Sequence, residues 1–357
     1  MYFKFLPNFR YFFSDFAPYL VFNALAFLLL LFLIYKVFKS KLSKYKKNLS
    51  LLLIFTTFIL VVTYTFCEAY FRFVYDKSDG LGFLRVNSKW QARHVIHNNY
   101  FYRDRDFTVQ KQEGVKRIGV IGDSIAFGGG IKNVDDRFSN LLEKKLIEAG
   151  YKVEVYNLGK PGYDTEAEIA EYQKVKNLNF DVVVWEYFLN DIQPKDKSTG
   201  TPILVRESKK GEIVTLLSNR SYFFDFLYWR IALKWQETLL ELKNADLARY
   251  SDRETLENHK MQISQFINDL KQENKEVVVI IFPLLAFLGP DYPANGVHQD
   301  MGEFFRSNGL EVVDLLDYLK GKNGKDFWAS EFDSHPNEYV HNLAAEKLFE
   351  AVRPFLK

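Results

Sequence analysis

The sequence predicts an α/β protein in which two transmembrane helices precede a three-layer domain built around a parallel sheet. Two observations near the N-terminus indicate the membrane part: residues 16–35 and 48–67 are each 20 residues long and carry no formal charge. A third observation indicates the sheet, because short apolar runs alternate with amphipathic stretches from residue 115 onward. Strands and helices that alternate in this way form a parallel sheet with helices on both faces.

The two uncharged segments have the length that a membrane span requires. About 20 apolar residues, at a rise of about 1.5 Å each, cross a hydrocarbon layer of ~30 Å. A cleaved signal peptide and a buried core helix are the alternatives. A signal peptide would lack a second span and would end in a small-residue cleavage site, which we do not find. We therefore interpret residues 1–75 as a membrane region with two transmembrane helices.

The charges between the two spans predict how the chain is oriented. The loop from Lys36 to Lys47 carries six lysines and no acidic residue, so the rest of the chain, whose total is +2, carries −4. Short lysine-rich loops stay in the cytoplasm. We therefore expect the N-terminus and everything after Cys67 outside, on a protein of the cell (inner) membrane with a periplasmic or otherwise extracytoplasmic domain. The lysines would also contact anionic lipid head groups.

Residues 76–114 are polar and show no clear periodicity, so we interpret them as a connecting segment that packs on the domain. Residues 115–357 carry the alternating pattern of the α/β domain. The expected strands are Arg117–Ile121, Lys152–Tyr156, Asp181–Trp185, Glu276–Phe282 and Glu311–Asp314. The expected helices are Phe138–Ala149, Glu166–Val175, 299–307 and 342–352.

An aromatic-rich insertion at about 195–275 interrupts this alternation. It begins with a polar stretch, Ile203–Val214, that could form a hairpin, and ends with a charged helix near Glu254–Gln272. Between them, residues 222–235 are rich in aromatic side chains. That segment is open to three interpretations: a helix buried against the sheet, a membrane-surface segment, or a cover for a lipid-like acyl group.

Composition excludes several classes of function. The chain has 47 basic and 45 acidic residues, which gives no electrostatic case for a nucleic-acid partner. Its single cysteine, Cys67, excludes an internal disulfide framework and a cysteine-based zinc site. The six histidines show no ligand spacing such as His-x-x-x-His, so we expect no metal and no cofactor.

The residues that could carry chemistry follow the predicted strands. Gly122-Asp123-Ser124 comes directly after the first strand, where functional residues of parallel sheets collect. A serine at that place could be a nucleophile, or only the N-cap of a helix. Position 126 is Ala, so the Gly-x-Ser-x-Gly nucleophile elbow is absent, as are the phosphate-loop and dinucleotide-binding glycine motifs.

Three further blocks follow later in the chain. The glycine loop after the second strand contains Gly162, which could direct a backbone N–H at a developing oxyanion, and Asn190 after the third strand could add a side-chain amide. Near the C-terminus lies Asp333-Ser334-His335. In an extended segment residues i and i+2 project to the same side, so Asp333 can accept from the Nδ1–H of His335 and leave Nε2 free for a serine proton.

This ordered set resembles the SGNH branch of the GDSL hydrolase family, whose name records the Ser, Gly, Asn and His of its four blocks. The resemblance covers 115–357 and none of the two spans. It implies a flavodoxin-like three-layer fold and a serine ester intermediate. It also implies that Ser124 is the nucleophile, His335 the base and Asp333 its orienting carboxylate. The N–H groups of Ser124 and Gly162, with the Asn190 amide, would form the oxyanion hole.

Two positions depart from the family pattern. Phe188 stands where the family often has a glycine, two residues before the block asparagine. The common Asp-x-x-His spacing is shortened to Asp-x-His, which puts Phe332 at the usual carboxylate position and leaves Glu331 as a second candidate partner for His335.

The sequence therefore favours a membrane-anchored serine esterase or deacetylase acting outside the cytoplasm. Its expected partners are the lipid bilayer and an acylated envelope glycan or small ester substrate, with a protein that modifies envelope polysaccharide as a further candidate. Two alternatives stay open: an O-acyltransferase that uses the same serine on cell-surface polysaccharide, and a non-catalytic scaffold for envelope assembly.

Overall fold

The computed structural model describes residues 16–192, 211–232 and 234–356 of the chain. These residues divide into two compact units. The first unit comprises residues 16–76, 84–86 and 211–232, and the second comprises 77–83, 87–192 and 234–356. The second unit thus contains nearly all of the predicted α/β domain, whereas part of the predicted insertion belongs to the first unit.

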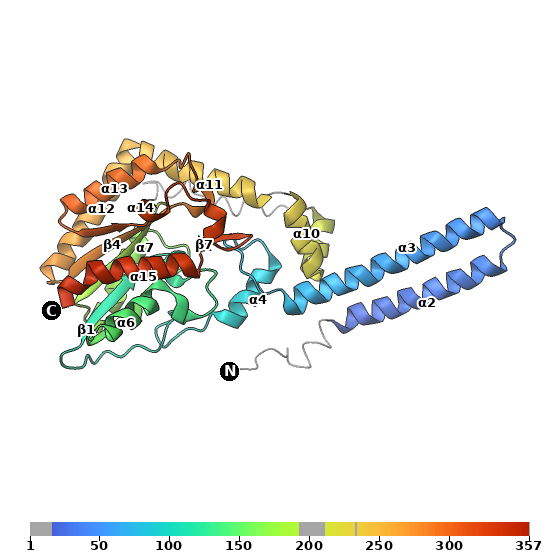
Figure 1. Cartoon of the computed structure of the whole chain (residues 1–357), viewed down its shortest axis with the longest axis horizontal. Coiled ribbons are helices and arrows are strands. Elements are labelled where there is room, and N and C mark those ends of the chain that lie inside the picture. Colours follow the sequence, from blue (N-terminus) through green and yellow to red (C-terminus); the bar gives the residue numbers. More distant parts are fainter. Residues whose placement is uncertain (1–15, 193–210, 233, 357) are drawn as a thin grey trace. The chain divides into compact units, whose positions relative to one another are not determined.

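The first unit is helical. Helices α2 (Ala17–Lys39) and α3 (Lys44–Ala69) lie side by side, and the π-helix η1 (Tyr70–Val74) continues α3 (Figure 1). Both long helices have the length and the apolar composition needed to cross a membrane, and their Leu and Phe side chains are largely exposed. They overlap the two spans predicted from the sequence. The unit also contains α9 (Glu212–Arg220) and α10 (Tyr222–Ala232).

The second unit is built on a five-stranded parallel sheet with the order β2-β1-β3-β4-β5. This is the flavodoxin-like order, in which the chain reverses direction across the sheet between β1 and β3. The predicted fold class is therefore confirmed. The strands are β1 (Lys116–Ile121), β2 (Val153–Asn157), β3 (Val182–Phe188), β4 (Glu276–Phe282) and β5 (Glu311–Asp314).

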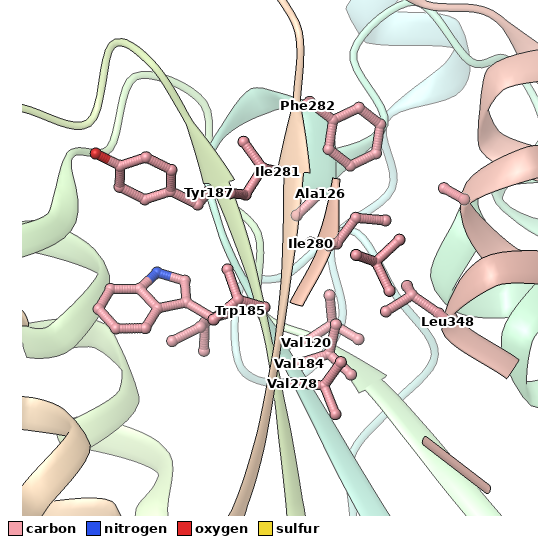
Figure 2. Packing of buried hydrophobic residues seen from close by; sticks show 14 of the residues in the cluster. Val120, Ala126, Val184, Trp185, Tyr187, Val278, Ile280, Ile281, Phe282 and Leu348 are labelled. Carbon is pink, nitrogen blue, oxygen red and sulfur yellow. The ribbon is translucent and has the colours of Figure 1, made fainter. Parts of the chain in front are cut away.

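Helices cover both faces of the sheet. Successive side chains of each strand point to opposite faces, so both faces carry side chains that these helices bury. Figure 2 shows Trp185 and Tyr187 on one face, and Val184 and Phe282 on the other. The main helices of the unit are α4 (Arg85–His94), which continues from the first unit, α5 (Ser124–Phe127), α6 (Phe138–Glu148), α7 (Thr165–Val175), α11 (Lys234–Ser251), α12 (Arg253–Gln272), α13 (Asn295–Ser307), α14 (Leu316–Leu319) and α15 (Glu338–Val352).

Ring contacts show which helices pack on which face. Trp185 packs edge-on against Phe266 of α12, with centroids 5.2 Å apart, and Phe138 of α6 lies 5.8 Å from Phe282. Helix α15 packs beside α6. The unit also contains the hairpin of β6 (Trp328–Ser330) and β7 (Asp333–Pro336), and the short turns η2 (Val134–Asp136), η3 (Lys176–Leu178), η5 (Leu285–Phe287), η6 (Gly324–Phe327) and η7 (Arg353–Leu356).

In three segments the structure adds to what the sequence predicts. The connecting segment contains the helix α4, where Val86 and Trp90 are buried one turn apart. Residues 203–210 of the expected hairpin lie outside the described residues. Of the described remainder, 211–214, Gly211 precedes α9 and 212–214 are helical, because Ile213 begins an apolar pattern with helical spacing. Residues 222–232 of the aromatic segment form α10, which packs on α3 and η1 of the first unit.

Candidate active site

The turn after β1 presents Ser124 as the first residue of α5. Asp123 caps this short helix, since its Oδ1 accepts from the N–H of Ile125 at 2.7 Å. The preceding residue must be glycine, because a Cβ at Gly122 would come within 2.5 Å of Glu186 Oε2. The N–H of Ser124 lies at the helix start, where an amide has no partner within the helix. Ser124 therefore offers a half-buried hydroxyl and a backbone N–H that has no partner within the helix.

Ser124, His335 and Asp333 form one hydrogen-bonded chain. His335 Nε2 lies 2.8 Å from Ser124 Oγ, and His335 Nδ1 lies 2.5 Å from Asp333 Oδ1. Asp333 and His335 are both in β7, so their side chains share a face of the hairpin. Glu331 and Phe332 form the turn between β6 and β7. The carboxylate on His335 Nδ1 is that of Asp333.

The charges around His335 make its ring a stronger base. Burial alone would lower the pKa of His335, but the charge and hydrogen bond of Asp333, with the nearby charges of Asp123 and Asp79, raise it overall. Burial would raise the pKa of Asp333, yet the charge of His335 and its hydrogen bond lower it. Asp333 thus stays ionised beside a ring that is ready to accept a proton.

Residues 78–80, at the start of the predicted connecting segment, lie against this pair. The N–H of Gly80 donates to Phe332 O at 3.0 Å, and Ser330 Oγ donates to Ser78 O at 2.8 Å. A Cβ at Gly80 would lie 2.7 Å from Asp333 Oδ1, so only glycine fits there without displacing the carboxylate. No local pattern in the sequence marks Asp79 and Gly80 as residues of the site.

The other two predicted site residues come from the neighbouring loops. Asn190 follows β3, and its Nδ2 lies 3.3 Å from Asp123 Oδ2, the same oxygen that lies 3.3 Å from Ser124 Oγ. The Asn190 amide is thus brought next to the serine. Phe188 ends β3 in register with Phe282, so this turn forms without the glycine that the family often has there.

Gly162 lies in the loop that follows β2, with φ +76° and open space around it. That loop is held on the serine turn by two earlier residues. The Lys160 N–H donates to Gly122 O at 3.2 Å, and Gly159 is packed so closely that a Cβ would lie 2.4 Å from Phe127 N. A donating role for the Gly162 N–H stays a prediction.

Four buried carboxyl groups lie in and around the serine turn. Glu186 Oε2 accepts from the N–H groups of Asp123 and Ala126, at 3.1 and 3.3 Å, and so holds the turn from below. Burial, together with the charges of neighbouring acids, raises the pKa of Glu186 well above its usual range.

Among the described residues no group of three or more His, Cys, Asp and Glu is arranged to hold a metal ion. The four carboxyl groups are Asp123, Glu168, Glu186 and Asp191.

Glu186→Gln is expected to stabilise the protein increasingly as the pH rises. Because the pKa of Glu186 is higher in the folded than in the unfolded chain, its stability contribution is complete below the unfolded pKa and is lost as the pH rises through the folded value. Glutamine keeps an acceptor and cannot ionise. Melting temperatures from pH 5 to 9 should therefore diverge in favour of the variant. Glu276→Gln, at an exposed position, is the control; a constant difference across the range would contradict the prediction.

The comparison with protein families decides the identity of this domain. Residues 120–343 match the model of the GDSL-like lipase/acylhydrolase family. The chain belongs to this family. As a GDSL-type protein it is a hydrolase that acts on ester bonds, which argues against the scaffold alternative. No curated protein is recognisably similar to the chain in sequence.

The search of solved structures found similar proteins, each at low sequence identity. TesA is 15% identical, with a TM-score of 0.42, over 68% of this chain and 100% of its own. The lipase/acylhydrolase from Enterococcus faecalis is 18% identical, with a TM-score of 0.42, over 68% and 97%. The psychrotrophic esterase EstA from Pseudoalteromonas sp. is 13% identical, with a TM-score of 0.39, over 68% and 98%.

Proposed function

We propose that this GDSL-type hydrolase is a membrane-anchored serine esterase that removes O-acyl groups, especially O-acetyl groups, from envelope glycans outside the cytoplasm. The observation that carries its chemistry is the hydrogen-bonded chain from Asp333 through His335 to Ser124. In this proposal residues 1–75 anchor the protein and residues 115–357 carry the catalytic domain.

In the first half of the reaction the acyl group moves to the enzyme. Ser124 Oγ attacks the carbonyl carbon of the ester while its proton passes to His335 Nε2. The bond from the carbonyl carbon to the alcohol oxygen then breaks, and His335 returns the proton to the departing alcohol. Asp333 accepts from the Nδ1–H throughout, which holds the ring in the required tautomer and stabilises its protonated form.

In the second half water removes the acyl group. His335 takes a proton from the water as its oxygen attacks the acyl carbon, and then returns the proton to Ser124 Oγ as the acid leaves. Each tetrahedral intermediate places negative charge on the former carbonyl oxygen. The N–H groups of Ser124 and Gly162 and the Asn190 amide are the proposed donors to that oxygen.

The proposed location of the domain outside the cytoplasm supports a glycan substrate. A domain held outside the cytoplasm by two spans meets the polysaccharides of the envelope, and their O-acetyl groups are esters of the kind that this chemistry cleaves. The full-length protein in vesicles, given an O-acetylated polysaccharide, should release free acetate. Acetate that appears only on an added glycan hydroxyl would instead establish the acyltransferase, and no reaction with acetylated glycans would refute the substrate class.

The proposed orientation predicts the outcome of reporter fusions. A reporter that is active only outside the cytoplasm should be active when fused after Asp79 and inactive when fused after Lys47, because the lysines at 36–47 hold their loop inside. A reporter that is active only in the cytoplasm should give the opposite pattern. Cytoplasmic activity after Asp79 would overturn both the location and the glycan substrate.

A further inference from the structure

A buried carboxylate at the end of the second long helix captures the start of α10. Glu68 has no exposed surface. Its carboxylate accepts from Ser221 Oγ at 2.7 Å and from the N–H groups of Tyr222 and Phe223 at 3.2 and 2.9 Å. Arg72, one turn further along, donates to the same carboxylate from Nε and Nη2 at 2.9 and 2.6 Å. Glu68 is therefore paired and also caps the positive end of α10.

Further contacts join both α9 and α10 to the same end of α3. Arg72 Nη2 donates to the carbonyl oxygen of Arg220, the last residue of α9, at 3.0 Å. The rings of Phe71 and Phe226 lie 4.2 Å apart between centroids. Tyr64 donates to Ser221 Oγ at 2.6 Å. These contacts join the C-terminal end of α3 and η1 to the junction of α9 with α10 and to the first turns of α10. The junction must therefore lie at the same depth as Glu68.

The length of the uncharged segment sets that depth. Glu68 is the first charged residue after the 20 residues 48–67, which at about 1.5 Å per residue cross ~30 Å of hydrocarbon. If α3 spans the membrane, Glu68 lies at the outer edge of the hydrocarbon layer. The junction of α9 with α10, bonded to Glu68, then lies at that edge as well.

The polarity of α9 is inverted relative to a helix that faces water. Ile213, Leu216 and Leu217 occupy one side at helical spacing and are exposed, Ile213 to 74%. Ser218 is 2% exposed and faces inward. On α10, Leu227 and Ile231 are likewise exposed one turn apart. A helix in water would place the leucines inside and the serine outside, whereas a helix at a membrane surface places its apolar face against lipid.

We propose that α9 and α10 form a third membrane element, an interfacial hairpin whose exposed apolar side chains lie among the acyl chains of the outer leaflet. The hairpin is part of the chain between β3 and β4, so the catalytic domain is attached to the membrane at two points of its sequence. This inference rests on the proposed membrane anchoring. Figure 1 shows α10 beside the C-terminal end of α3. Glu68 belongs to the last turn of that helix.

Spin labels at three positions test the inference in the full-length protein. In a Cys67→Ser background, the variants are Leu217→Cys and Asn219→Cys, two exposed positions on nearly opposite sides of α9, and Leu53→Cys, exposed on α3. The labelled proteins are placed in vesicles of phosphatidylethanolamine and phosphatidylglycerol. Collisions with oxygen, which concentrates in lipid, are compared with collisions with an aqueous nickel chelate.

The label at 217 should collide more with oxygen than with nickel, and the label at 219 should show the opposite preference. Equal nickel access at 217 and 219 would overturn the inference, and so would exclusion of both reagents at 217, because a protein surface would then cover that side. The label at 53 separates the two proposals. Nickel access at 53 would refute the membrane anchoring itself, whereas a lipid environment at 53 with water at 217 refutes only the interfacial hairpin.

Discussion

Ser124→Ala is expected to lower kcat for ester hydrolysis by about 10⁴-fold or more while the fold stays intact. The substitution removes the atom that forms the acyl-enzyme, so the two-step route through His335 is lost. Among the described residues the hydrogen-bond partners of Ser124 Oγ are His335 and Asp123, both in the site, so its loss leaves the sheet untouched. Turnover of a small acetyl ester, with circular dichroism to check the fold, measures the effect. Labelling by a fluorophosphonate probe should disappear at the same time.

A double variant tests whether the two residues act together. His335→Ala should reduce turnover about as strongly as Ser124→Ala, and the combination should cost little more than either, because the members of such a triad work as a unit. Substantial activity in purified, folded Ser124→Ala protein would refute the serine mechanism. Additive losses in the double variant would show that His335 acts independently of Ser124.

Asp333→Asn is expected to reduce the rate by up to about 10⁴-fold. The amide keeps the size of the side chain but no longer holds His335 in the tautomer that leaves Nε2 free to accept a proton. The negative charge of Asp333 also raises the pKa of His335, so its removal should lower that pKa. The acid limb of the kcat/KM profile should therefore move to lower pH, an effect that a purely structural role would not produce.

Glu331→Gln is the matched control, because sequence spacing left both carboxylates as candidates. Glu331 lies in the turn between β6 and β7, whereas Asp333 Oδ1 lies 2.5 Å from His335 Nδ1. We expect Glu331→Gln to have near wild-type activity and an unchanged pH profile. A crippled Gln variant beside a near wild-type Asn variant would make the assignment of Asp333 wrong, and would leave the roles of Ser124 and His335 unaffected.

Local patterns in the sequence were sufficient to predict the sheet and the residues at its edge. Each strand is a short apolar run that is bounded by turns, and parallel strands all end at one edge, so Ser124 and Asn190 are expected near each other. The two-residue spacing of Asp333 and His335 likewise encodes a shared face of a strand. The two long helices are predicted by the length of the two uncharged segments alone. These features depend on residues that are close in sequence.

Other features depend on contacts between distant segments, and only the tertiary structure decided them. Asp79 and Gly80 enter the site because the hairpin of β6 and β7, some 250 residues later, hydrogen-bonds to the backbone of Ser78 and Gly80. Glu186 is an ordinary strand residue by pattern, and its burial under the serine turn comes from the pairing of β3 with β1.

The position of α10 was decided in the same way. Its aromatic side chains fit a sheet face, a membrane surface or a cover for a site equally well, because hydrophobicity has no direction. The hydrogen bonds of Glu68 to the start of α10 do have direction, and they join residues more than 150 positions apart. Periodicity identifies which residues become buried, but the partner that buries them is selected by directional contacts that no local pattern contains.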